Sequence, residues 1–161
     1  MKVTIDFESR SACDLKKRGA WVYSEDPTTE VLCLAFKWEG HKAQCLRDIL
    51  HHGGSEEARA LVGNLIKDAS TIEAHNMAFE YAMWTNVCVK RYGWPPLPVE
   101  KLRCSAAKAA MHSLPRHLEG ACQALGLRMQ KDMEGHRLML KMCKPRKPRK
   151  DEPEINPNDP R

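Results

Sequence analysis

The feature that most constrains the fold is a strict alternation of apolar and polar residues over positions 2–8. The apolar positions are Val3, Ile5 and Phe7, and the polar positions between them are Thr4, Asp6 and Glu8. Side chains alternate between the two faces of a β-strand, so this period of two predicts a strand with one face in the core and one polar face.

The following elements predict an α/β domain. Residues 31–36 read VLCLAF, an apolar run that is typical of a strand covered on both faces. A turn at 39–41 leads to a third strand at 43–46. Periodicity and capping residues then indicate a helix behind Ser55, a strand at 71–74, a helix from Asn76 to about Tyr92, an extended segment at 101–104, and helices at about 117–125 and 133–143. This order predicts a mixed sheet with helices covering its faces.

Length and composition bound the class of protein. A chain of 161 residues corresponds to one ordinary domain, and its 42% hydrophobic and 29% charged residues exclude disorder over the whole length. No apolar run approaches 18 residues and no signal peptide is visible, so we expect neither a secreted nor a membrane protein. Seven scattered cysteines without a CxxC spacing favour reduced thiols in the cytoplasm.

Charge divides the chain into a domain at 1–143 and a tail at 144–161. The tail contains six basic and four acidic residues and five of the ten prolines. We interpret it mainly as an extended, solvated Pro-rich tail or linker, although its basic run is able to contact phosphates. The remaining 20 basic and 17 acidic residues leave the domain at +3, which permits nucleic-acid binding without requiring it.

Three acidic residues stand out as candidate ligands. Asp6 and Glu8 leave the same face of the first strand, and Glu80 is the only charged residue among apolar neighbours at 77–84. A solvated strand face, or a buried Arg or Lys beside Glu80, would also account for them. Together they favour a carboxylate cluster for Mg²⁺ or Mn²⁺. Two such ions about 3.5–4 Å apart can cleave a phosphodiester bond.

These residues resemble the first two motifs of the DEDD superfamily of 3′–5′ exonucleases. More narrowly, the chain is similar to the proofreading-type exonuclease domain of phage family A DNA polymerases. The similarity covers roughly residues 3–145 and rests on four ordered segments: IDFESRSACDLKKRGAWVYSEDPTTEVLCLAFKW, AHNMAFEYAMW, LPRHLEGACQALGL and KDMEGHRLMLKMCKP.

The resemblance implies an RNase H-like fold and a two-metal site holding Mg²⁺ or Mn²⁺. It implies that Asp6, Glu8 and Glu80 are the catalytic metal ligands, with Glu80 where most members have Asp. Asn76 and Phe79 would position the helix and the 3′-terminal nucleotide. His75 would touch a substrate phosphate or make a structural hydrogen bond.

The implied partners are a single-stranded DNA 3′ end and a DNA polymerase domain or chain. The implied location is the cytoplasm, which is that of a bacterial host if the chain derives from a phage. Two alternatives stay open: a catalytically weak nucleic-acid-binding or assembly module completed by a polymerase partner, and an RNase H-like ribonuclease.

One departure concerns the third motif of the family, a helix with Tyr or His four or five residues before a metal-binding Asp. The later aspartates are Asp132, Asp151 and Asp159, and none has Tyr or His at either position. We therefore expect the fold to lack its C-terminal motif helix and the active site to be incomplete. A truncated chain, a split protein or a degenerate copy would explain this. Because the first two motifs are intact, we favour a truncated chain or a split protein over a degenerate copy.

Overall fold

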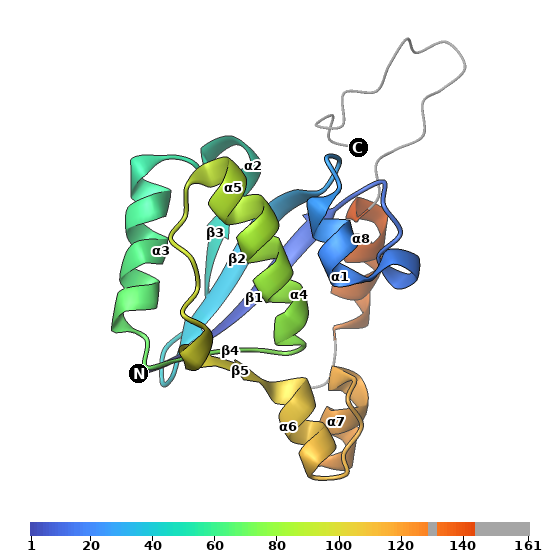
Figure 1. The fold of residues 1–161 in the computed structure, drawn as a ribbon. Coiled ribbons are helices and arrows are strands. Elements are labelled where there is room, and N and C mark those ends of the chain that lie inside the picture. Colours follow the sequence, from blue (N-terminus) through green and yellow to red (C-terminus); the bar gives the residue numbers. More distant parts are fainter. Residues whose placement is uncertain (129–131, 144–161) are drawn as a thin grey trace, which may run out of the picture.

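The computed structural model describes residues 1–128 and 132–143, and a five-stranded mixed sheet forms its centre (Figure 1). The strands are β1 (Lys2–Arg10), β2 (Glu30–Trp38), β3 (Gln44–Arg47), β4 (Thr71–Ala74) and β5 (Leu102–Cys104), in the order β3-β2-β1-β4-β5. β1, β2 and β3 are antiparallel neighbours, whereas β4 and β5 run parallel to β1. This arrangement with its flanking helices confirms the predicted α/β, RNase H-like fold.

The described helices lie between these strands or after β5. They are α1 (Leu15–Glu25), α2 (Ile49–His52), α3 (Glu56–Asp68), α4 (Met77–Met83), α5 (Lys90–Tyr92), α6 (Ser105–Met111), α7 (Leu118–Ala124) and α8 (Met133–Met142). A π-helical segment, Trp84–Val89, joins α4 to α5, and a 3₁₀ turn, Val99–Lys101, precedes β5. Figure 1 shows α6 and α7 as a lobe below the sheet. None of the described helices is long and apolar enough to span a membrane.

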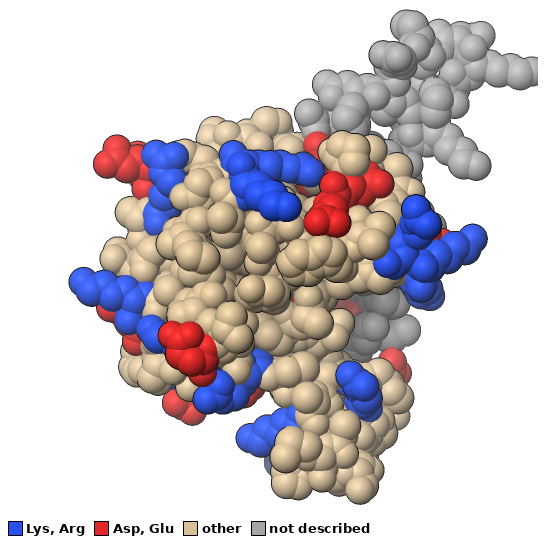
Figure 2. Space-filling model, viewed as in Figure 1, with Lys and Arg blue, Asp and Glu red and all other residues tan. Residues whose placement is uncertain are grey.

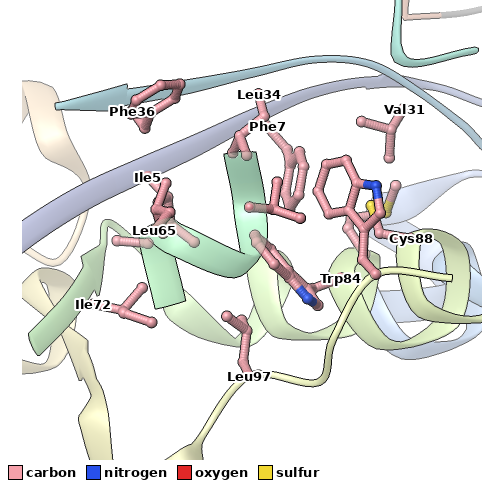
Figure 3. Packing of buried hydrophobic residues seen from close by; sticks show 14 of the residues in the cluster. Ile5, Phe7, Val31, Leu34, Phe36, Leu65, Ile72, Trp84, Cys88 and Leu97 are labelled. Carbon is pink, nitrogen blue, oxygen red and sulfur yellow. The ribbon is translucent and has the colours of Figure 1, made fainter. Parts of the chain in front are cut away.

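One face of the sheet carries the hydrophobic core. The apolar side chains of β1 pack with those of β2, and α3 and the π-helical segment cover them (Figure 3). The rings of Trp84 and Trp94 meet edge to face with centroids 4.9 Å apart, and Phe7 lies 5.9 Å from Trp84. Trp84 also donates a hydrogen bond from Nε1 to the carbonyl of Pro95 at 2.8 Å. The core therefore uses the apolar positions that the alternation in β1 predicts.

The opposite face of the sheet is more open than the sequence suggests. In β2, Leu34 and Phe36 are buried, but Cys33 and Ala35 are only partly buried and Lys37 is exposed. All side chains of the predicted run 31–36 are buried or partly buried, so the second face of this strand is covered, but less completely than the first.

Other local predictions need correction. Asn76 does not cap α4 with its side chain; its backbone is left-handed, with φ 72°. The expected loop at 51–55 begins with the last turn of α2. α1 and α6 are additional helices that hydrophobic periodicity did not indicate. The tail at 144–161 lies outside the described residues.

Candidate functional site

A cavity of about 740 Å³ opens beside the carboxyl-terminal half of β1. Residues from β1, α1, α4, α8 and the segments next to them line it. The lining includes all six residues that the sequence singles out: Asp6, Glu8, His75, Asn76, Phe79 and Glu80. Positions separated by more than 70 residues in the chain thus share one cavity.

The short length of β4 explains how Glu80 reaches this place. The parallel register between β1 and β4 ends at the pair Thr4 and Glu73, and α4 begins at Met77. α4 therefore lies next to the part of β1 after Thr4, which does not pair with β4. Its fourth residue is Glu80, which lies close enough to Asp6 for the two carboxylates to repel each other.

Glu80 is the most unusual group in the cavity. It is 2% exposed, and its Oε2 atom is buried without a hydrogen-bond partner. Burial raises the pKa of Glu80 to about 8, and the negative charge of Asp6 raises it further, although hydrogen bonds from backbone amides, including that of Phe7, oppose the shift. A carboxylate in this setting is stabilised by a proton or by a cation.

Asp6 and Glu8 lie on the open face of the sheet, where their side chains are exposed. Across the antiparallel register they face Ala35 and Cys33 of β2. Partial desolvation of their carboxyl groups nevertheless raises the pKa of both, with His75 opposing the shift at Asp6 and the charge of Asp6 adding to it at Glu8. Two neighbouring carboxylates on an accessible face suit a cation that arrives from solvent.

His75 and Phe79 are held by neighbouring groups at the cavity wall. His75 Nδ1 lies 3.0 Å from Ser105 Oγ, and Nε2 lies 2.9 Å from the carbonyl oxygen of Arg116. The imidazole thus has a structural partner at each ring nitrogen. The ring of Phe79 is tilted against that of Tyr23, with centroids 6.1 Å apart.

Several lining residues escaped the sequence reasoning. Tyr23 of α1 lies with its hydroxyl 3.1 Å from Ser9 Oγ, and Met139, Leu140 and Cys143 line the cavity from α8 and its end. The amide of Ser11 donates to the carbonyl of Cys143 at 3.1 Å, which ties the end of α8 to the end of β1. Asp14, which caps α1 by accepting bonds from two backbone amides, was the available signal for this helix.

The donor atoms of the cavity fit a hard divalent cation in type and charge. Three carboxylates line it, and the buried Oε2 of Glu80 lacks a partner. Among residues 1–128 and 132–143, however, no three His, Cys, Asp or Glu side chains are grouped closely enough to hold a metal by themselves. Asp132 does not line this cavity, and its Oδ1 accepts hydrogen bonds from the amides of Glu134 and Gly135 at the start of α8.

The fold and the cavity define the class of protein, which is an RNase H-like domain with acidic residues at the end of its central strand. No family model matches the chain. The chain is similar to the DNA polymerase of Bacillus phage SP02, with 32% identity over 149 residues. This similarity covers 92% of the chain but 22% of the polymerase, so the chain spans about a fifth of the relative that it matches. The chain is therefore similar to one segment of a phage DNA polymerase.

Proposed function

We propose that the chain is a metal-dependent 3′–5′ exonuclease domain of the proofreading type, acting on single-stranded DNA 3′ ends, whose active site lacks the metal ligand of the third motif and is incomplete in this chain. The observation that carries the proposal is the buried, unpartnered Oε2 of Glu80 in a cavity that Asp6 and Glu8 also line. Similarity to a phage DNA polymerase supports a role beside DNA synthesis. A polymerase domain or chain is accordingly the proposed protein partner.

Asp6, Glu8 and Glu80 are the residues that would hold Mg²⁺ or Mn²⁺. When bound, such ions supply activation of water and stabilisation of the leaving oxygen in phosphodiester cleavage. The raised pKa of Glu80 means that a cation competes with a proton for this carboxylate. The more accessible Asp6 and Glu8 give the cation its path from solvent.

The other lining residues would position the terminal nucleotide. Phe79 and Tyr23 present a pair of tilted rings at the cavity, a surface on which a base or sugar can pack. His75 and Asn76, which connect β4 to α4, line the same cavity and would contact the backbone of that nucleotide. Because hydrogen bonds on both sides fix the imidazole of His75, we assign it a positioning role.

The test is degradation of a single-stranded oligonucleotide by the full chain with Mg²⁺ or Mn²⁺. A 3′ label should appear first as a mononucleotide, whereas a 5′ label should give a ladder of shortened strands. Asp6→Ala should lower the rate by roughly 100-fold, the upper value found even for outer-shell partners of a metal. The matched control is Asp68→Ala, which removes an exposed carboxylate at the end of α3.

Each outcome separates the candidate functions. Absence of metal-dependent degradation together with retained oligonucleotide binding would refute the exonuclease and favour the nucleic-acid-binding module. Preference for an RNA strand would favour the ribonuclease instead. An unchanged rate in Asp6→Ala would remove this residue from the site.

A further inference from the structure

A second cavity, of about 630 Å³, lies between the end of β4 and the lobe formed by α6 and α7. Alkyl side chains dominate its lining, and they come from Ala109, Leu114, Leu118, Ala121, Leu125 and Leu127. Leu118 and Leu125 are 52% and 56% exposed. The lobe therefore presents an accessible apolar hollow, with Lys108 and His112 among its polar lining residues.

This lobe cavity adjoins the carboxylate cavity through a single ring. His75 lines both cavities, and its two ring nitrogens contact Ser105 and Arg116 of the lobe. The lobe cavity and the carboxylate cavity therefore adjoin at the side chain of His75.

Charge distinguishes the segment at 101–128, which includes β5 and the lobe, from the rest of the domain. Residues 101–128 contain five basic side chains and one acidic side chain, Glu119, whereas residues 1–100 contain 12 basic and 14 acidic ones. Lys101 and Arg103 donate to nearby backbone carbonyls, while Lys108 and Arg116 are exposed. Figure 2 shows basic side chains on the visible face of the lower lobe. The lobe is thus suited to a polyanion.

We propose that the lobe cavity receives an upstream nucleotide of a single-stranded nucleic acid whose 3′ end occupies the carboxylate cavity. This inference rests on the proposed function. The base packs against the alkyl side chains, since burial of its faces removes apolar surface from water. The phosphate lies toward Lys108 and His112 and away from the carboxylate of Glu73, which also lines the cavity.

The charge balance favours a nucleic acid over a segment of protein as the occupant. An apolar hollow alone fits either one. A net charge of +4 over residues 101–128, next to a cavity proposed to bind a DNA end, matches a phosphate backbone. A protein segment seated in the lobe cavity is the competing outcome of the test.

The experiment measures the affinity of a fluorescent dT8 for the full chain in EDTA, where no metal-dependent cleavage occurs. Lys108→Glu should weaken binding roughly tenfold and lower the slope of log K against log salt by about 0.7, the value for one phosphate contact on a single strand. Leu118→Trp should tighten binding by about fivefold or more, because indole stacking on a base contributes about 1–3 kcal/mol. A gain of affinity cannot come from misfolding.

Two matched controls place the same changes elsewhere. Lys67→Glu reverses an exposed charge on α3, and Leu138→Trp alters a leucine of α8 that is 55% exposed and lines neither cavity. Both should bind dT8 within about twofold of the parent chain, since neither is expected to contact the strand.

The results separate this inference from the proposed function. If the lobe variants bind dT8 like their controls, the inference is overturned and a protein segment becomes the better occupant, even when cleavage is observed. If the lobe variants change affinity but the chain cleaves no DNA, the inference holds and the exonuclease proposal fails.

Discussion

The two faces of β1 differ in burial and in charge. Val3, Ile5 and Phe7 are at most 5% exposed, whereas Thr4, Asp6 and Glu8 on the same strand are all exposed. Burial of the first set stabilises the fold. The second set contributes little packing, and its two carboxylates repel each other and are accessible to a cation. The alternation in β1 thus places the residues that stabilise the fold on one face and the candidate metal ligands on the other.

The largest effect is expected on the packed face. Trp84→Ala should lower the free energy of unfolding by roughly 5 kcal/mol, at the upper end for such truncations. The indole is fully buried, packs edge to face against Trp94 and donates a hydrogen bond to the carbonyl of Pro95. Its loss therefore leaves both a cavity and an unpaired carbonyl. Urea unfolding followed by circular dichroism measures the change.

The control for this variant is Trp21→Ala on α1. Trp21 is 48% exposed, and the same truncation there should cost less than about 1 kcal/mol. Equal losses in the two variants would show that the face covered by Trp84 is not the main source of stability.

The second effect concerns Glu80 of α4, whose carboxylate is buried close to that of Asp6. The folded pKa of Glu80, about 8, lies above its ordinary value of 4.5. The folded state therefore binds the extra proton, and stability is lost as the pH rises from about 4.5 through 8. Glu80→Gln removes this loss. The stability of the variant relative to the parent should grow between pH 5 and pH 9, by at most about 3 kcal/mol when water in the cavity is allowed for.

Melting temperatures at several pH values, in EDTA, measure this gap. The same substitution at exposed Glu25 provides the control. Replacing EDTA by Mg²⁺ at pH 9 should then stabilise the parent chain and leave Glu80→Gln almost unchanged, because the cation replaces the proton only on a carboxylate. A gap that does not depend on pH would contradict the burial of an ionisable group at this position.

Much of this contrast could be predicted from the sequence. The period of two in β1 assigned each residue to its face, and a lone acid among apolar neighbours marked Glu80. Both signals are local, since they depend on neighbours within one or two turns or along one strand. The run VLCLAF did not reveal that Cys33 and Ala35 are only partly buried, because apolarity alone does not show how closely other elements cover each face.

The rest of the cavity depends on contacts between distant segments. α1 has a backbone break at Gly19, where φ is 77° and ψ is 165°, so no regular stripe of apolar residues revealed it. The backbone hydrogen bond between Ser11 and Cys143 joins residues that are separated by most of the sequence. The role of His75 between the two cavities likewise follows from Ser105 and Arg116, which no spacing connects to it.

The smallest effect is the interaction between Asp6 on the open face of β1 and Glu80 of α4, measured by a double-mutant cycle of Asp6→Asn and Glu80→Gln. The charge of Asp6 helps to raise the pKa of Glu80, so removing it should ease ionisation of Glu80 and stabilise the chain at pH 9 in EDTA. In the Glu80→Gln background that gain should disappear. We expect a coupling free energy of about 0.5–1 kcal/mol at pH 9, and almost none at pH 5, where Glu80 is protonated. Pairing Glu80→Gln with Glu39→Gln, in an exposed turn, should give no coupling at either pH. A coupling of the same size at both pH values would mean that packing, rather than charge, connects the open face of β1 to the buried helix.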